Sequence, residues 1–349
     1  MKIGYVNINS GNSRDVVTIR GLRENGATVI ELTDNTPGWR KFGEIAKKIK
    51  ESKNHFDLII VGYTGGILVP WLWLINKRPV VYNALASFYE SMIISRRAGT
   101  RFSPAGFKYW LIDWLAFRTA KLILVESQHQ KDYLRKTFHI SPEKIIIHLT
   151  GVDDSSFYFD PAIKKLGRFT VLFRGKFLPE AGVDTVLKAA KLLEKENIDF
   201  RILGHGLLEK NVRQLVDDLK LKNVELITEY LALEKLREKM LECHLSLGQM
   251  ADHPRLQNTI PHKAFESLAM KLPYLTGRQP AVLEILRENE TCLCCQPGDP
   301  MDLANKILNL EKEPERLTNL AAKAFDWYQN NLTAKKMGGK LLNQLTSFS

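Results

Sequence analysis

The chain has 349 residues, of which 44% are hydrophobic and 26% are charged, and its formal net charge is +11. This length corresponds to about two domains, and the balanced composition excludes a largely disordered or fibrous chain. The opening MKIGYV has the pattern of a strand and not of a cleaved secretory signal. The longest apolar segment, near Gly66–Ile75, is shorter than the roughly 20 residues of a membrane-spanning helix.

Four cysteines favour a reducing compartment over a disulfide scaffold. We therefore expect a cytoplasmic protein. The positive charge leaves three classes of partner open: nucleic acid, an anionic membrane surface and a phosphorylated small molecule.

Apolar, β-branched runs alternate with amphipathic stretches through the first half of the chain. The predicted strands are Lys2–Ile8, Thr28–Leu32, Leu58–Val61, Pro79–Asn83, Leu122–Glu126 and Lys144–His148. The predicted helices between them are Asp15–Glu24, Trp39–Glu51, Phe107–Ala120 and Gln130–Phe138. This alternation is typical of βαβ units with a parallel sheet.

The alternation stops in a polar stretch, Gly151–Leu166, and then begins again. We place the boundary there, with a first domain at residues 1–160 and a second at 161–325. The second-half strands are predicted at Phe169–Arg174, Phe200–Leu203, Val224–Thr228, Leu245–Leu247, Leu272–Thr276 and Cys292–Cys295. The helices are predicted at Glu180–Glu194, Leu208–Leu219, Leu233–Glu242, Pro261–Met270, Ala281–Glu288 and Asp299–Leu310.

The last segment, Phe325–Leu345, has the pattern of one helix with an apolar face. We expect residues 326–349 to pack on or near the first domain, although a terminal helix on its own domain fits the pattern equally. The predicted fold is α/β, with two Rossmann-like doubly wound domains facing a central cleft. Such domains bind ligands at the carboxyl ends of their strands.

The first chemical signal is FRGKFLPEAGVD, in which a strand runs through a glycine-containing loop into a helix. Backbone amides at such a loop suit an anion, and Lys176 adds a positive charge beside Gly175. In the alternative interpretation the glycines only satisfy backbone geometry.

A second strand ends in Gly204-His205-Gly206. This is part of a dinucleotide-binding fingerprint without its third glycine, and a lone Gly-x-Gly is more often a turn.

The third signal is NTIPHKAFESLAMKLP, which begins at Asn258. Pro261 suits the first turn of a helix, and Lys263 and Glu266 share one face because they are three residues apart. Glu266 can accept hydrogen bonds from the two vicinal hydroxyls of a ribose, and Lys263 with the helix start can meet a diphosphate. A salt bridge on a solvated face is the alternative.

Together these blocks resemble the family 4 retaining glycosyltransferases, which have the GT-B fold. The resemblance covers nearly the whole chain. Its most specific blocks are the third signal and the later QPGDP with Leu303-Ala304. Gly151-Val-Asp153 followed by Phe157 and Pro161 is similar to the family's inter-domain signature.

The resemblance implies a donor of the nucleoside-diphosphate-sugar class, held mainly by the second domain, and transfer to a hydroxyl of a glycan or a lipid-linked glycan with retention of configuration. Lys176, Glu266 and Asn258 would be catalytic. The implied donor-binding residues are Gly175, Lys176, Gly204, His205, Asn258, Thr259, Ile260, Lys263 and Glu266. The chain has no Asp-x-Asp, the carboxylate pattern that a metal on a diphosphate would need, so we expect no metal and no cofactor.

Three positions depart from the family pattern. Asn258 stands where a second acid is usual, Ala181 where a loop lysine is expected, and Lys271 where a glycine is usual. A non-catalytic GT-B scaffold with a weakened donor site is therefore an alternative function, and a GT-B nucleotide-sugar epimerase is another.

The first domain would bind the acceptor, and Gly11, Asn12 and Asn83 are its candidate residues. A plain βα turn is an equal interpretation of the loop that contains Gly11 and Asn12.

Residues 1–160 hold 22 Lys and Arg and 15 Asp and Glu, a net charge of +7. The remaining residues hold 28 Lys and Arg and 24 Asp and Glu, a net charge of +4. Six of these cations and one acid fall in residues 91–121. Four tryptophans lie in or near this stretch: Trp71, Trp73, Trp110 and Trp114. Basic and aromatic residues together suit an anionic membrane surface, so peripheral association with the inner face of a membrane is our hypothesis. The alternative is a set of core tryptophans and solvated charges. No nucleic-acid-binding module is recognisable, and we expect no nucleic-acid partner.

Overall fold

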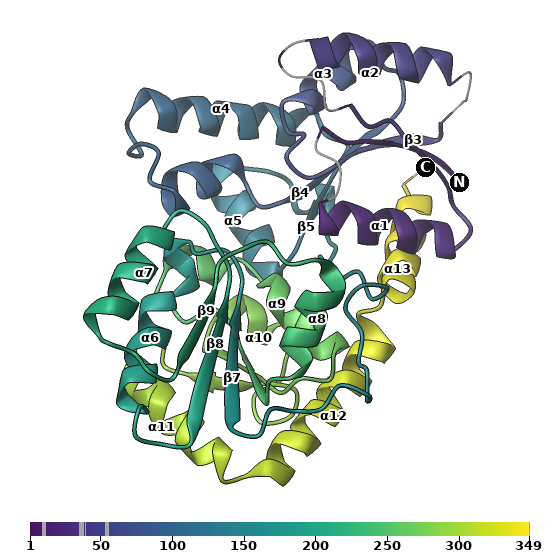
Figure 1. The fold of residues 1–349 in the computed structure, drawn as a ribbon. Coiled ribbons are helices and arrows are strands. Elements are labelled where there is room, and N and C mark those ends of the chain that lie inside the picture. The colour runs from purple at the N-terminus through teal and green to yellow at the C-terminus, as the bar shows by residue number, and fades with distance from the viewer. Residues whose placement is uncertain (9–11, 35–37, 39, 53–55, 349) are drawn as a thin grey trace. The chain divides into compact units, whose positions relative to one another are not determined.

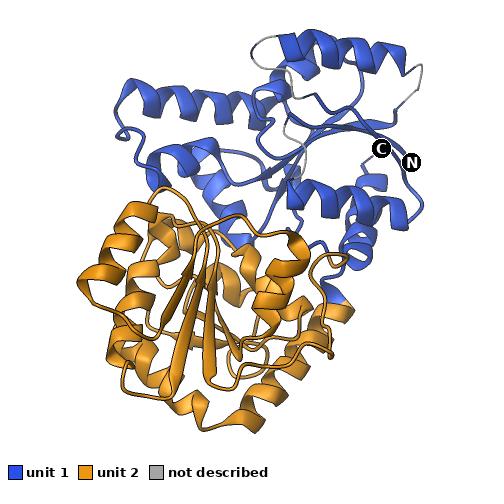
Figure 2. Ribbon diagram, in the orientation of Figure 1, with its two compact units in different colours: residues 1–153, 331–349 blue, residues 154–330 orange. Residues whose placement is uncertain are grey.

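The computed structural model describes residues 1–8, 12–34, 38, 40–52 and 56–348. In it the chain divides into two compact units, as Figure 2 shows. Unit 1 contains residues 1–153 and 331–349, and unit 2 contains residues 154–330. Each unit is built on one six-stranded parallel sheet, which confirms the predicted α/β class.

The sheet of unit 1 has the strand order β2-β1-β3-β4-β5-β6 (Figure 1). Its strands are β1 (Lys2–Val6), β2 (Thr28–Glu31), β3 (Leu58–Val61), β4 (Val80–Leu85), β5 (Leu122–Val125) and β6 (Ile145–Ile147). Alternate residues of β3 belong to two cores. Leu58 and Ile60 pack with Ile3, whereas Ile59 and Val61 pack with Val6. Both faces of the sheet are therefore covered, which is why the strand is apolar throughout.

Polar residues begin most helices of unit 1. The helices are α1 (Ser13–Glu24), α2 (Arg40–Glu51), α3 (Leu68–Ile75), α4 (Pro104–Thr119), α5 (Gln128–Phe138) and α13 (Ala334–Thr346), with a π-helix at Glu90–Ser95. The side chains of Asn12, Ser103, Ser127 and Thr333 accept backbone N–H groups at the starts of α1, α4, α5 and α13. Such caps satisfy N–H groups that have no partner within the helix.

The C-terminal helix α13 packs along α1 in unit 1 (Figure 1). The helices touch at two glycines. A Cβ on Gly21 would lie 2.2 Å from the carbonyl oxygen of Ala334, and a Cβ on Gly338 would lie 2.1 Å from the carbonyl carbon of Gly21. Leu341 and Leu345 extend the contact into the core that also holds Ile3. The two backbones can come this close only because neither residue has a side chain.

Unit 2 has the strand order β12-β11-β10-β7-β8-β9. Its strands are β7 (Phe169–Arg174), β8 (Ile198–Leu203), β9 (Val224–Ile227), β10 (Leu245–Leu247), β11 (Tyr274–Gly277) and β12 (Leu293–Cys295). Its helices are α6 (Val183–Leu192), α7 (Glu209–Asp218), α8 (Leu233–Leu241), α9 (His262–Ala269), α10 (Pro280–Leu283), α11 (Pro300–Glu311) and α12 (Pro314–Asn331). One buried cluster of this unit combines the strands mainly with α6 and α11. Helix α9 is buried as well, outside that cluster.

The units divide between Asp153 and Asp154, earlier than the sequence boundary at 160/161. Two residues after the division, Tyr158 and Phe159, contact side chains of unit 2. The ring of Tyr158 lies under the guanidinium of Arg237, 3.9 Å from its carbon to the ring centroid, and Phe159 packs edge-on against Phe325.

Two predictions of helices are wrong. The segment Phe325–Leu345 is two helices, α12 and α13, because the chain turns after Asn331 and Thr333 caps a new helix. The helix predicted at Ala281–Glu288 is the shorter α10. In addition, the sequence patterns do not predict α3, because its LVPWLWLI sequence is apolar on all sides and has no amphipathic period.

Candidate functional site

In each unit the strand order reverses beside the first strand, between β1 and β3 in unit 1 and between β7 and β10 in unit 2. Doubly wound sheets bind ligands outside the carboxyl ends of the strands at such a switch point. In unit 2 this edge carries the loop after β7, the loop after β10 and the helix α9. Four of the predicted donor residues lie here: Gly175, Lys176, Lys263 and Glu266.

Glycines allow the loops of this edge to pack backbone against backbone. Gly175 has a φ of 147°, and a Cβ on Gly204 would lie 1.9 Å from the carbonyl oxygen of Gly175. Gly182, with a φ of 68°, would place a Cβ 2.3 Å from the backbone nitrogen of Ala251. Any side chain at Gly204 or Gly182 would therefore push the loops apart. The backbone geometry of these loops therefore requires glycine at both positions.

Lys263 is a buried cation at the switch point. Its ammonium lies 3.4 Å from the carbonyl oxygen of Gly248, which follows β10, and 3.8 Å from the ring centroid of Phe173 on β7. Among the described residues no carboxylate oxygen lies within the 4.0 Å of a salt bridge to it. Burial, with the positive charge of Arg174, lowers the pKa of Lys263 to about 7, against the opposite effect of Glu266.

Glu266 lies one turn further along α9 and is 4% exposed. Its two carboxylate oxygens accept from Nη1 of Arg174 at 2.5 and 2.6 Å. Arg174 is the last residue of β7, and its guanidinium carbon lies 5.5 Å from the ring centroid of Phe157. The edge therefore holds two cations and one carboxylate in a largely dehydrated place, where electrostatic interactions are strong.

A second ion pair fixes the segment before α9. Nη1 of Arg255 donates to Glu180 at 2.6 Å, and both side chains are largely buried. The charge of Arg255 is thus balanced by Glu180, which directly precedes Ala181. The Nδ1 of His253 accepts the backbone N–H of Arg255, so this histidine caps a short 3-10 turn.

Asn258, Thr259 and Ile260 follow that turn and lead into α9. Asn258 and Thr259 are half-buried, Ile260 is buried, and the backbone N–H of Asn258 donates to the carbonyl of Arg255 at 3.1 Å. The side chains of Lys176 and His205 are exposed. Their loops are joined, because the backbone N–H of Phe177 donates to the carbonyl of His205 at 2.8 Å.

Unit 1 carries a buried polar network at the carboxyl edge of its sheet. Arg14 is completely buried, and its guanidinium donates to Oδ1 of Asn83 at 2.6 Å and to the hydroxyl of Thr150 at 3.0 Å. The Thr150 hydroxyl donates in turn to Glu126. Burial lowers the pKa of Arg14, and the charge of Glu126 opposes this effect.

Asp15 extends this network. Its Oδ1 accepts from the hydroxyl of Tyr5 at 2.7 Å, from Nδ2 of Asn83 at 3.1 Å and from the backbone N–H of Tyr63 at 3.1 Å. Burial raises the pKa of Asp15, and these hydrogen bonds oppose it. Both ends of the Asn83 amide are engaged, so Asn83 holds the edge together from inside. Asn12 caps α1, and Gly11 lies outside the described residues.

Two family models match the chain. Residues 154–327 match the model described as "Glycosyl transferases group 1", and residues 12–156 match the model described as "Glycosyltransferase Family 4". The chain belongs to these group 1, family 4 glycosyltransferases. The two matched segments correspond closely to unit 2 and to most of unit 1.

Two curated glycosyltransferases match about half of this chain. An uncharacterised glycosyltransferase of Methanocaldococcus jannaschii is 25% identical over 172 residues, which are 48% of this chain and 46% of that protein. The 2-deoxystreptamine N-acetyl-D-glucosaminyltransferase of Niallia circulans is 25% identical over 175 residues, which are 49% of this chain and 44% of that protein. The chain thus spans about half the length of the curated relatives it matches.

Solved glycosyltransferase-type structures share the whole fold. HepE of Anabaena, in complex with UDP and glucose, has a TM-score of 0.77 at 17% identity, over 99% of this chain and 100% of that one. Sucrose-phosphate synthase of Thermosynechococcus elongatus has a TM-score of 0.80 at 15% identity, over 100% of both chains. At these identities the likeness establishes the GT-B fold and nothing finer.

The sequence patterns did not single out Arg174, although a signal exists. An arginine ends a strand that is otherwise FTVLF, directly before Gly175. A charged residue at the carboxyl end of a buried parallel strand lies where ligands bind. The Arg14–Asp15 pair at the start of α1 was missed for a different reason, since charges in a first helical turn are usually solvated.

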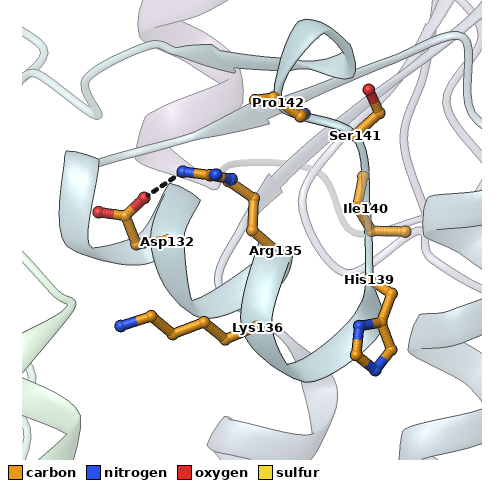
Figure 3. Close-up of a pocket in the computed structure, with 7 residues that line it drawn as sticks. All are labelled: Asp132, Arg135, Lys136, His139, Ile140, Ser141 and Pro142. Carbon is orange, nitrogen blue, oxygen red and sulfur yellow. Dashed lines mark hydrogen bonds and ion pairs between the residues drawn. The ribbon is translucent and has the colours of Figure 1, made fainter.

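Other groupings outside these edges carry less chemistry. A cavity of about 450 Å³ lies at the end of α5. Among its lining residues, Arg135 points to Asp132 on the same helix (Figure 3), and the two side chains are 3.0 Å apart. Cys292, Cys294 and Cys295 are buried free thiols at β12. Across the described ranges no three His, Cys, Asp or Glu side chains gather in a way that could hold a metal ion. No helix in those ranges is both long and apolar enough to cross a bilayer.

Proposed function

We propose that this protein transfers a sugar from a nucleoside-diphosphate-sugar to a hydroxyl of a glycan or lipid-linked glycan, with retention of configuration. The observation that carries the proposal is the buried ammonium of Lys263 at the switch point of unit 2, the part that matches the group 1 model. No described carboxylate oxygen lies within 4.0 Å of this ammonium. A buried cation of this kind is costly unless an anion joins it. The diphosphate of the donor is that anion. HepE, which shares the fold, binds UDP-glucose, so a uridine nucleotide is the first donor to test.

Glu266 is the proposed partner of the ribose. Each carboxylate oxygen can accept more than one hydrogen bond, so Arg174 leaves capacity for two vicinal hydroxyls. Arg174 and Lys263, with Lys176 on the adjacent loop, would balance the charge of the diphosphate. Gly175, Gly204, His205, Thr259 and Ile260 would line the nucleotide, and Asn258 would contact the transferred sugar.

The proposed chemistry needs no nucleophile from the protein. The acceptor hydroxyl attacks the anomeric carbon from the face that the nucleotide leaves, and a donor phosphate oxygen takes the acceptor proton. The protein contributes position and stabilises the negative charge that develops on the leaving diphosphate. Because side-chain cations can supply this stabilisation, we propose a reaction without a metal or another cofactor.

Unit 1 would bind the acceptor at the carboxyl edge of its sheet. Asn83, Arg14 and Asp15 hold the ends of β1, β3 and β4 in one hydrogen-bond network. In this role Asn83 positions the edge and Asn12 fixes the start of α1, and Gly11, which precedes Asn12 in the sequence, is a further candidate.

We also propose that unit 1 lies at the inner face of an anionic membrane, which would bring it to a lipid-linked acceptor. Three of the four tryptophans, Trp71, Trp110 and Trp114, are partly buried against the core, whereas Trp73 is 56% exposed. The exposed apolar side chains of this region include Phe102 and Phe107. Arg101 and Lys108 stand next to them in the sequence and are exposed as well.

The test is a thermal-shift panel of UDP-, GDP- and ADP-sugars, followed by mass spectrometry of products with soluble glycan acceptors. Ligand at 100 times its Kd should stabilise the protein by about 2.7 kcal/mol. A transferred sugar with the donor's anomeric configuration in the NMR spectrum supports the proposal. Binding without any transfer favours the scaffold, and a converted donor sugar without an acceptor favours the epimerase.

A further inference from the structure

A groove of about 570 Å³ lies at the amino edge of the unit 1 sheet, opposite the edge that holds the Arg14 network. Three parts of the chain form it: the end of α3 with the segment that leads into β4, the end of α4 with Lys121 just before β5, and Lys144 just before β6. Its lining residues are Trp73, Asn76, Lys77, Arg78, Pro79, Val80, Arg118, Thr119, Ala120, Lys121 and Lys144. The proposed transfer chemistry uses none of them.

The groove is strongly basic. Five of its lining residues are Lys or Arg, and none of those described is acidic. The ammonium of Lys144 donates to the carbonyls of Phe117 and Arg118, at 3.3 and 3.0 Å, where α4 ends. Burial lowers the pKa of Lys144, and the charges of Arg118 and Lys121 add to this effect. Cations that repel one another across a concave surface favour an anion between them.

An apolar helix borders the groove. Helix α3 has no charged residue, and only one side of it faces the core, through Leu68, Val69 and Leu72. Its last residues are exposed: Trp73 by 56%, Leu74 by 73% and Ile75 by 51%. Trp73 is also part of the groove wall. Large aliphatic and indole side chains that stay in water beside a basic groove call for a partner with both apolar and anionic parts.

A phospholipid bilayer with anionic headgroups has both. We propose that the groove binds the phosphates of anionic phospholipids while Trp73, Leu74 and Ile75 enter the interfacial layer. Nucleic acid would satisfy the cations but would leave Leu74 and Ile75 against a charged backbone. This inference deepens the proposed membrane association and rests on it. It names the docking residues, and it depends on neither the donor site nor the acceptor.

The test is flotation of the full chain with two kinds of vesicle, pure phosphatidylcholine and phosphatidylcholine with 30% phosphatidylglycerol, at low salt. The groove variant is Lys77→Glu with Arg78→Glu, and the apolar variant is Trp73→Ser with Leu74→Ser. The matched control is Lys335→Glu with Lys336→Glu, which makes the same charge change at two neighbouring exposed lysines of α13 in the same unit. Thermal melts verify that each variant is folded.

We expect the wild-type protein to float with the anionic vesicles only. The groove variant should lose at least tenfold in partition coefficient, since each cation near the surface contributes about a fivefold effect. The apolar variant should lose several-fold, and the control less than twofold. Equal losses in the groove variant and the control would overturn the proposal, because only net charge would then matter.

Two further measurements distinguish a membrane from other anionic ligands. In the first, inorganic pyrophosphate raises the melting temperature of the wild type but not of the groove variant, and the wild type does not bind vesicles. That result would show a site for soluble phosphates and overturn the membrane proposal. Retention of a labelled RNA without vesicle binding would overturn it as well. Nucleotide-sugar binding is measured in parallel on the same proteins. Its failure alone contradicts the proposed function and leaves the docking result intact.

Discussion

Arg174 and Glu266 form an ion pair at the carboxyl end of β7, with one guanidinium nitrogen 2.5 and 2.6 Å from the two carboxylate oxygens. The pair is 92 residues apart in the sequence and joins the first strand of unit 2 to α9. A carboxylate that faces a cation in this way can accept further hydrogen bonds from donor groups. A ribose offers two such donors. The same Arg174 repels Lys263 and, after burial, is the next cause that lowers the pKa of that lysine.

The first prediction concerns the pH dependence of donor binding. Lys263 has a pKa of about 7 in the free protein, and a bound diphosphate would raise it. The protonated form binds the donor, so affinity for the tightest-binding nucleotide-sugar should be constant below pH 6.5. It should then fall by up to tenfold per pH unit above pH 7.5. Calorimetric titrations between pH 6 and 9 measure this slope.

The matched variant is Lys263→Met, which keeps the length of the side chain and removes the charge. Its affinity should be weaker at pH 6 and independent of pH. A wild-type affinity that does not change across this range would contradict the assignment of Lys263 to the diphosphate.

Substitution of Arg174 tests the coupling between the charges. In Arg174→Met the cation that lowers the pKa of Lys263 is absent and Glu266 has no other described ion-pair partner. We expect the midpoint of the pH dependence to move upward by one unit or more, with weaker binding at pH 6 because one cation is lost. An unchanged midpoint would mean that Arg174 does not act on Lys263.

The contact of α1 with α13 gives a prediction for stability. Gly338→Ala would place a methyl group 2.1 Å from the backbone of Gly21, so the helices must separate. We expect a loss of about 1–3 kcal/mol in the free energy of unfolding, measured by urea titration. The control is Gly43→Ala in α2, where no described atom lies within 4 Å of the added methyl. It should be neutral or stabilising by up to about 1 kcal/mol.

If Gly338→Ala were as stable as the wild type, the docking of α13 on α1 would be wrong. Nucleotide-sugar binding by the variant should be unchanged as long as unit 2 is folded, because both glycines lie in unit 1.

His148 makes unit 1 sensitive to acid. The Thr18 hydroxyl donates to the carbonyl of Arg14 at 2.7 Å and lies 3.0 Å from Nε2 of His148. The imidazole must therefore donate from Nε2. Burial, with the nearby charge of Arg14, lowers the pKa of His148 to about 3. The unfolded chain, with a histidine pKa near 6.5, binds more protons between pH 3 and 6.5, so stability falls as the pH drops through this window.

Between pH 7.5 and pH 5.0 this single group should remove up to about 2 kcal/mol from the free energy of unfolding. His148→Gln keeps an N–H donor and cannot titrate, so the difference between the two pH values should shrink by that amount. Urea midpoints at both pH values measure it. The same acid dependence in wild type and variant would exclude His148 as its source.

Much of the fold could be predicted from local patterns. Strands β3, β7 and β10 match the predicted residues at both ends, because each is a short and mostly apolar run with a charged residue or histidine before it and a glycine after it. The helix that carries Lys263 and Glu266 was also expected, since its apolar face has a clear helical period. The break before α13 was not, because the cap at Thr333 is a single residue in an otherwise continuous helical pattern.

The site was only half predictable for a related reason. The spacing of Lys263 and Glu266 shows that they share a face, but no pattern shows that Arg174 reaches Glu266 from a strand far away in the sequence. The burial of Arg14 is equally long-range, since its partners Asn83 and Thr150 lie 69 and 136 residues away. Such pairs depend on which strands become neighbours in the sheet.

The most direct test of the account is calorimetric titration of UDP-glucose, or of the tightest-binding donor in the panel, into the wild type, Glu266→Ala and Glu242→Ala at pH 6.5. Glu242 pairs with the buried Arg201 at 2.5 Å in the same unit, so its loss is a matched control for removing a carboxylate from an arginine. We predict that Glu266→Ala loses at least tenfold in affinity while the folded Glu242→Ala variant binds like the wild type. Equal binding by Glu266→Ala and the wild type would contradict the assignment of this edge of unit 2 to the nucleotide-sugar.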